Sequence, residues 1–206
     1  MEDDPRLAKF GQFTPSGQLT PGYGQSYLFF VGKDDIHSIL HSLLTSETIA
    51  LKLAMFGFDD EELNQDIISL MKNPGIRVQA TLDKSQAGGV HERNILSMDE
   101  TNNPDFLTSF AIGESSTHQI SHSKGAVLIG QGLWFEGSTN WSNSGEGTGI
   151  SLKPGIPNVV GYKNQNNTLL VSCNPVMLSH FGEQLDKEHL VAMKQMLAKD
   201  GIMKQV

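Results

Sequence analysis

Residues 122–140 read HSKGAVLIGQGLWFEGSTN, and this stretch decides the fold. Residues 125–129 are apolar and rich in strand formers, which predicts a buried β-strand. The Gly-Gln-Gly sequence at 130–132 is typical of a turn, and residues 133–136 read as a returning strand. The stretch therefore predicts a β-hairpin with polar residues at both of its open ends.

The polar residues of this hairpin are expected to converge. His122 and Lys124 are two apart on a strand, so their side chains lie on the same face. The returning strand carries Ser138 and Asn140 back to the same level, with backbone N–H groups exposed at Gly137. An imidazole, an ammonium, a hydroxyl and a carboxamide together suit the attack on an oxyanion and its binding, as in a phosphodiester.

The same residues resemble the phospholipase D superfamily motif, in which H-x-K is followed downstream by G-S-x-N. The matching positions are His122, Lys124, Gly137, Ser138 and Asn140. The stretch departs from the family pattern because Ile129 stands where the family has Asp, and because the spacing to Gly137 is one residue longer. In the family that Asp supports the fold around the site, so its loss bears on activity more than on fold.

The motif suits a two-step displacement at phosphorus, and because the sequence supplies no cage of carboxylates around it, we expect no metal or other cofactor. The resemblance implies the roles of the individual residues. His122 would form a phosphohistidine intermediate. Lys124 and Asn140 would bind the phosphoryl oxygens, and Ser138 would add a hydrogen bond. The carboxylate that orients the catalytic histidine in relatives is replaced here by Asn166, which has no charge.

The sequence carries one H-x-K motif and no internal repeat. One histidine cannot conveniently act as nucleophile and as leaving-group acid on opposite sides of an in-line phosphorus. We therefore expect a homodimer with two-fold symmetry and the site across its axis. His118, four residues before His122, is the alternative acid.

Strands and helices are expected to alternate before the motif, an order that also resembles a phospholipase D domain over about residues 26–200. We predict an α/β fold with a phospholipase D-like mixed β-sheet flanked by helices on both faces. Residues 1–25, rich in Pro and Gly, are expected to form an extended N-terminal arm, and residues 26–206 a single domain. The expected strands are 26–31, 48–56, 76–82, 106–112, 125–129, 133–136 and 168–172, and the expected helices begin after 34–35, at 59–62, at 90 and after 174–175.

Two groups of residues invite a metal interpretation, and neither is favoured. His37 and His41 are four apart on a predicted helix, but no third ligand follows at a known spacing, so half-buried histidines are expected. The acidic run 59–62 fits a solvated helix start that complements the helix dipole. The single cysteine, Cys173, excludes an internal disulfide and a cysteine-based zinc site, and its apolar neighbours predict a buried thiol.

The amino-acid composition limits which partners the protein is expected to bind. The net charge of −8 and the 15 Lys and Arg residues argue against a broadly basic nucleic-acid surface, although a local basic pocket is compatible with them. No apolar run reaches membrane-spanning length and no export signal precedes the first strand, which predicts a cytoplasmic protein without stable membrane insertion. An exported mature form would read the same, so export stays an alternative.

The favoured interpretation is a metal-independent nuclease that acts on DNA or RNA. Single-motif members that resemble this chain are mostly nucleases, and the lack of a membrane anchor or basic amphipathic helix favours nucleic acid over lipid. The negative charge argues the other way, so a phospholipase D-type hydrolase of lipids such as cardiolipin is one alternative. A degenerate member that binds phosphate or a partner without turnover is another, because of Ile129 and Asn166.

Overall fold

The structure is a computed structural model that describes residues 2–57, 59–102, 107–114, 121–147 and 167–199. Its centre is a seven-stranded sheet in the order β1-β7-β6-β5-β2-β3-β4. Strands β2, β3 and β4 are parallel, and every other neighbouring pair is antiparallel. The strands are β1 Ser26–Phe30, β2 Ala50–Met55, β3 Arg77–Asp83, β4 Thr108–Gly113, β5 Lys124–Leu128, β6 Leu133–Gly137 and β7 Thr168–Ser172.

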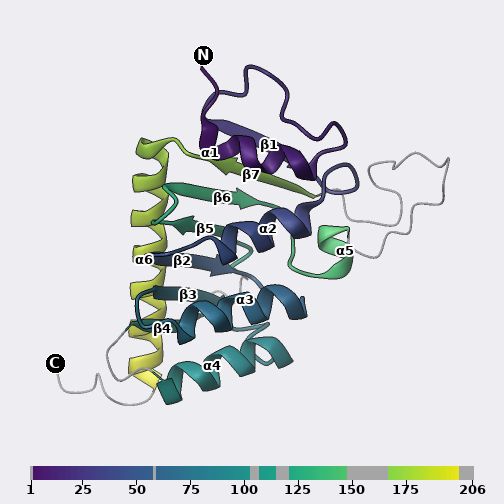
Figure 1. The fold of residues 1–206 in the computed structure, drawn as a ribbon. Helices are drawn as coiled ribbons and strands as arrows, with labels where there is room; N and C mark the ends of the chain where they lie inside the picture. Colours follow the sequence, from purple (N-terminus) through teal and green to yellow (C-terminus); the bar gives the residue numbers. More distant parts are fainter. Residues whose placement is uncertain (1, 58, 103–106, 115–120, 148–166, 200–206) are drawn as a thin grey trace.

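Helices cover both faces of this mixed sheet, as predicted (Figure 1). One face carries α2 (Ile36–Thr45), α3 (Glu61–Lys72) and α4 (Val90–Asn102), which lie side by side. The long helix α6 (Pro175–Lys199) crosses the other face. The parallel strands β2, β3 and β4 are joined through α3 and α4, the connection that parallel pairs require.

Short polar side chains fix where these helices begin. The carboxylate of Asp35 accepts a hydrogen bond from the backbone N–H of Ser38 at the start of α2. Asp60 does the same for Leu63 at the start of α3. Asn174 accepts from two N–H groups in the first turn of α6. Each cap satisfies N–H groups that lack a partner within the helix, so the helix starts follow from the local sequence.

The main core lies between the sheet and the α2–α4 layer, and a smaller apolar cluster lies under α6. Strand β5 contributes to both because its side chains alternate: Ala126 and Leu128 belong to the main core, and Val127 belongs to the cluster under α6. All five residues of β5 are buried, so this strand is a central one. The H-x-K motif therefore begins at the middle of the sheet.

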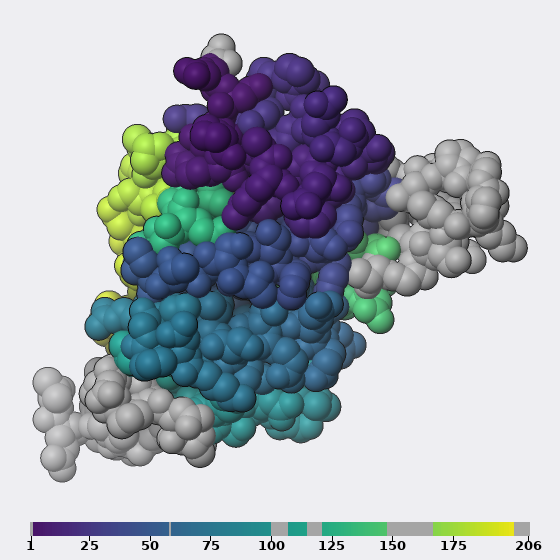
Figure 2. Space-filling view, in the orientation of Figure 1, coloured from purple at the N-terminus to yellow at the C-terminus, as the bar shows by residue number. Residues whose placement is uncertain are grey.

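The expectation of an extended N-terminal arm is wrong for residues 5–13, whereas residues 14–25 contain no helix or strand. Residues 5–13 form α1 (Pro5–Ala8) and a 3-10 helix, η1 (Lys9–Phe13), which Figure 2 shows over one end of the molecule. Leu7 and Phe10 are fully buried in the main core, and the Phe10 ring lies 6.4 Å from that of Phe29. Burial of these two side chains drives the N-terminal segment to fold onto the core, and the proline and glycine content gives no sign of it.

Within the described ranges, no helix combines the length and the apolar character that crossing a bilayer requires.

Candidate active site

The predicted hairpin is present and places the H-x-K residues beside the end of β2. Strands β5 and β6 pair from Gly125–Glu136 to Leu128–Leu133. Lys124 pairs with Met55 of β2, and one residue further the N–H of Phe56 donates to the carbonyl of Ser123 at 2.8 Å. The backbone around the motif is thus fixed by ladder hydrogen bonds on both sides of β5.

His122 and Lys124 share one face, as the two-residue spacing predicts, because both contact Phe56. The imidazole ring centre lies 4.9 Å from that of Phe56, and the ammonium of Lys124 lies 5.3 Å from the same ring. His122 is exposed, whereas Lys124 is only 2% exposed and donates to the carbonyl of His122 at 2.8 Å. Burial lowers the pKa of Lys124. An accessible imidazole therefore lies next to a largely desolvated cation.

Gly137 acts through its lack of a side chain. A Cβ at this position would lie 2.1 Å from the carbonyl oxygen of Thr168 in β7. The next N–H, that of Ser138, donates to the same oxygen at 3.1 Å, and the Ser138 hydroxyl accepts from the N–H of Thr168 at 3.1 Å. The N–H of Ser138, next to Gly137, is therefore paired with β7. The glycine lets the two backbones approach.

Asn140 lines a cavity of about 310 Å³ that adjoins the H-x-K residues through Phe56. Trp141, which follows it, is buried, and its carbonyl accepts from the N–H of Asp59 at 2.6 Å. Besides Phe56 and Asn140, the cavity is lined by Gly57, Asp59, Gln86, Gly89, Val90, Glu92, Trp141 and Ser142. Among the described residues, no hydrogen bond or ion pair joins the imidazole of His122 to another side chain.

A carboxylate distant in sequence occupies the turn where the motif lacks its Asp. Ile129 is partly exposed at this turn, and its N–H donates to Ala50. Glu47, buried at 3% exposure, accepts four backbone N–H groups through one carboxylate oxygen, including that of Gly130 at 2.8 Å. The turn of the longer hairpin is thus held by Glu47, which sequence spacing gave no reason to select.

Asp83 supports the approach to His122 from the end of β3. It is 5% exposed and accepts from the N–H of Ser121 at 2.6 Å and from Ser85 through both its N–H and its hydroxyl. Burial opposes ionisation of Asp83, but these hydrogen bonds outweigh it, and its pKa lies below the ordinary value. The sequence signal for this residue is its place directly after the expected strand 76–82.

Two further predicted residues, Asn166 and His118, lie outside the described residues.

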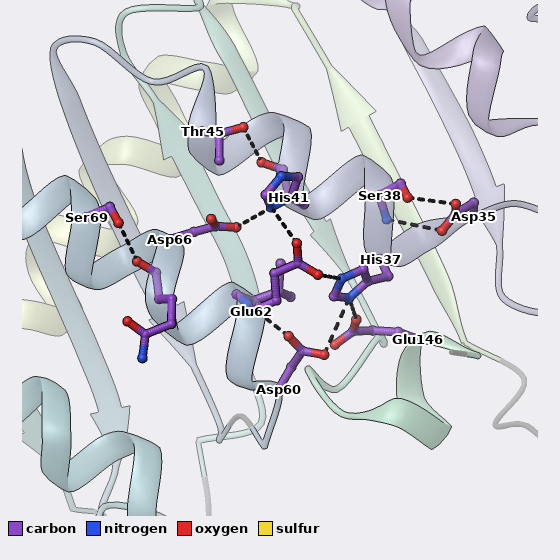
Figure 3. Close-up of polar contacts among 12 residues, drawn as sticks. Asp35, His37, Ser38, His41, Thr45, Asp60, Glu62, Asp66, Ser69 and Glu146 are labelled. Carbon is purple, nitrogen blue, oxygen red and sulfur yellow. Dashed lines mark hydrogen bonds and ion pairs between the residues drawn. The ribbon is translucent and has the colours of Figure 1, made fainter. Parts of the chain in front are cut away.

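The segment after Asn140 is fastened to the helical layer by a charged cluster (Figure 3). Helix α5 (Asn143–Glu146) ends at Glu146, whose carboxylate lies 2.7 Å from Nδ1 of His37. Nε2 of His37 lies 2.8 Å from Glu62, and Nδ1 lies 3.4 Å from Asp60. The expectation of a solvated acidic helix start is wrong for Asp60, which is 6% exposed.

The hydrogen bond to Glu146 raises the pKa of His37 to about 9, although burial opposes it. Burial raises the pKa of Glu146 to about 7, and the bond to His37 opposes that shift. The raised pKa of His37 keeps this imidazole protonated at neutral pH, whereas the raised pKa of Glu146 shows that burial opposes ionisation of its partner.

Comparison with known proteins agrees with the geometry at the level of fold. A scan against protein-family models found no match, and a search of curated proteins found no relative. Among solved structures, NucT from Helicobacter pylori superposes with a TM-score of 0.58 at 17% identity, over 80% of this chain and 94% of NucT. Nuc from Salmonella typhimurium, a phospholipase D family member, superposes with a TM-score of 0.54 at 15% identity, over the same shares.

This chain has a phospholipase D-type fold. The phosphatidylserine synthase of Haemophilus influenzae has a similar fold, with a TM-score of 0.53 at 13% identity, over 77% of this chain and 36% of the synthase. In the phospholipase D-type fold of this chain, His122 lies just before the central strand β5 and Lys124 begins it, and G-S-x-N starts at the last residue of its hairpin partner β6.

Proposed function

We propose that this protein is a phosphodiesterase that cleaves nucleic acid through a phosphohistidine on His122. The observation that carries the proposal is the pairing of an exposed imidazole with a buried ammonium on one face of the central hairpin. An accessible nitrogen can reach phosphorus, and a cation held in a poorly solvated place interacts strongly with the charge that develops there. Both features are needed for displacement at a phosphodiester.

Each remaining residue of the motif then has a role that its position supports. Lys124 has three donors, of which one is used on the carbonyl of His122, so it can also bind a phosphoryl oxygen. Asn140 at the adjoining cavity and Ser138, directly after β6, would bind the other non-bridging oxygen. Attack of His122 forms the nitrogen–phosphorus bond as the ester oxygen leaves with a proton, and water then releases the phosphate and restores the imidazole.

The proton for the leaving oxygen comes from a second copy of the chain in this proposal. A two-fold dimer would bring the partner's His122 to the far side of the phosphorus, opposite the nucleophile. Light scattering with size-exclusion chromatography tests this directly. A strictly monomeric protein that is fully active would contradict the shared site, and would direct attention to His118.

Nucleic acid is the proposed substrate because the single-motif members that this sequence resembles are mostly nucleases. The experiment compares wild type with His122→Ala on labelled single- and double-stranded DNA, RNA and cardiolipin vesicles, all in EDTA. We expect wild type to cleave a nucleic acid in EDTA, and the variant to lose activity by about a thousandfold or more. Its melting temperature should not change, because the side chain of His122 is exposed and makes no hydrogen bond to a described residue.

His180→Ala is the matched control, because His180 is also an exposed histidine but lies on α6. An acid-labile phosphoryl group trapped on wild type and missing from His122→Ala would support the intermediate. Activity that requires Mg²⁺ would contradict it, and cleavage of cardiolipin alone would identify the lipid alternative. Phosphate binding without turnover of any substrate would identify the non-catalytic alternative, which Ile129 motivates.

A further inference from the structure

Three potential metal ligands meet at one point from three separate elements. His37 lies in the first turn of α2, Asp60 caps α3, and Glu146 ends α5 (Figure 3). Asp60 and Glu146 are buried, and the side chain of His37 is 16% exposed. The proposed phosphodiesterase chemistry does not use this cluster directly.

The spacing of the ligand atoms suits a small divalent cation. Nδ1 of His37 lies 2.7 Å from a carboxylate oxygen of Glu146 and 3.4 Å from one of Asp60. One ligand atom from each residue lies within 4.8 Å of the others. Ligands at the zinc distances of about 2.0–2.2 Å stand roughly 3.3 Å apart in a tetrahedron, so only small adjustments are needed.

A buried oxygen without a partner provides a second, independent observation. Glu146 is 2% exposed, and its Oε1 atom has no hydrogen-bond partner among the described residues, although Oε2 contacts His37. A buried carboxylate oxygen normally finds a donor, because leaving it unsatisfied is costly. Here it belongs to a group that faces a second buried carboxylate, Asp60. A cation would satisfy this oxygen and would balance two carboxylates that share one imidazole.

The surroundings of His37 match those of a metal-binding histidine. Glu62 lies 2.8 Å from Nε2, on the side of the ring opposite the cluster. A carboxylate in this place accepts a hydrogen bond from Nε2–H and leaves the lone pair of Nδ1 for the metal, which is the usual outer arrangement around metal-bound histidine. Glu62 is 60% exposed and can adjust its position as the metal binds.

We propose that His37, Asp60 and Glu146 form a structural site for a zinc-class divalent cation. One imidazole and two carboxylates suit zinc, with water as a fourth ligand. The site would tie α5 to α2 and α3. Glu146 lies six residues after Asn140, and Ser142 between them lines the Asn140 cavity. Bound metal would thus fix the segment that carries Asn140, without contact with the phosphodiester.

The test is metal binding by the full-length chain, measured independently of activity. Chelator-treated protein is titrated with Zn²⁺ in a calorimeter, and with Co²⁺ while the visible absorption is followed. We expect one ion per chain, a tetrahedral Co²⁺ spectrum and a higher melting temperature with Zn²⁺. Asp60→Asn and Glu146→Gln should each weaken Zn²⁺ binding tenfold or more, because each removes a charged ligand.

The matched control is His41→Gln. His41 lies one turn further along α2 and pairs with Asp66 at 2.8 Å, but it is not one of the three ligands. Its loss should leave the Zn²⁺ affinity unchanged. Binding of fewer than one Zn²⁺ per chain, or a Zn²⁺ affinity of Glu146→Gln equal to that of wild type, would overturn the proposal. The cluster would then be an ion pair between protonated His37 and the carboxylates.

Should Glu146→Gln fail to fold, the ring nitrogens of wild type still decide the question by NMR. Zn²⁺ must shift the Nδ1 resonance of His37 and leave that of His41 in place. A His37 resonance that does not respond to Zn²⁺ would refute the site.

Discussion

Replacement of Gly137 by Ala should destabilise the protein severely, and the structure gives the size of the effect. The new Cβ would lie 2.1 Å from the carbonyl oxygen of Thr168 and 3.1 Å from Cα of Leu169. Both are backbone atoms of β7, so no side-chain rotation can relieve the overlap. The ends of β6 and β7 must separate by more than 1 Å to reach ordinary contact at roughly 3.4 Å.

This separation weakens three hydrogen bonds that bridge the two strand ends. Two are accepted by the Thr168 carbonyl, from Ser138 N–H at 3.1 Å and Thr139 Oγ1 at 3.0 Å, and the third runs from Thr168 N–H to Ser138 Oγ at 3.1 Å. Each contributes about 0.5–1.5 kcal/mol, and overpacking costs about 1–3 kcal/mol. With partial relaxation, the free energy of unfolding should fall by about 2–5 kcal/mol.

The assay is thermal and urea unfolding followed by circular dichroism, with Gly182→Ala as the control. For a chain of this size, a loss of about 2–5 kcal/mol lowers the melting temperature by roughly 5–15 °C. Apart from the neighbouring backbone of α6, a Cβ at Gly182 meets no atom of the described residues within 4 Å. Alanine is also more favourable than glycine in a helix by about 0.8–1 kcal/mol. Gly182→Ala should therefore melt at or above wild type. If Gly137→Ala melts with wild type, or if both variants fall equally, the close approach of β6 and β7 is refuted.

Other perturbations separate the roles of buried polar groups. Lys124→Met should keep the free energy of unfolding within about 1–2 kcal/mol of wild type, because the methionine side chain has a similar shape and removes a desolvated charge. Activity should fall about 100-fold or more. A loss of stability as large as the loss of activity would show that Lys124 is merely structural. Burial lowers the pKa of His189, against the opposing effects of the Ala80 backbone and the carboxylates of Asp186 and Asp99. The unfolded chain therefore takes up a proton first, and stability should decline as pH falls below 6.5, with a smaller decline in His189→Gln; parallel pH profiles in urea titrations would contradict this. Burial raises the pKa of Cys173 to about 11, so the native thiol should resist a disulfide reagent at pH 8 and react after unfolding; rapid reaction of the folded protein would show that the thiol is accessible.

The sequence by itself determined the elements whose signals are local. The apolar run 125–129, the Gly-Gln-Gly turn and the returning strand 133–136 predicted the hairpin, and the two-residue spacing predicted the shared face of His122 and Lys124; the structure contains both. The acidic and amide residues before α2, α3 and α6 predicted where these helices begin. Such features depend on backbone geometry within a few residues, so they can be read without knowing what packs against them.

Only the tertiary structure decided which distant groups complete the site. Glu47 is 83 residues from the Gly130 N–H that it accepts, and Glu146 is 109 residues from His37. The N-terminal segment likewise folds because Leu7 and Phe10 reach the main core. Gly137 is needed because β7, which follows much later in the chain, passes close to its Cα. These contacts depend on strand order and on helices packing across the sheet, and spacing along the sequence carries no information about either.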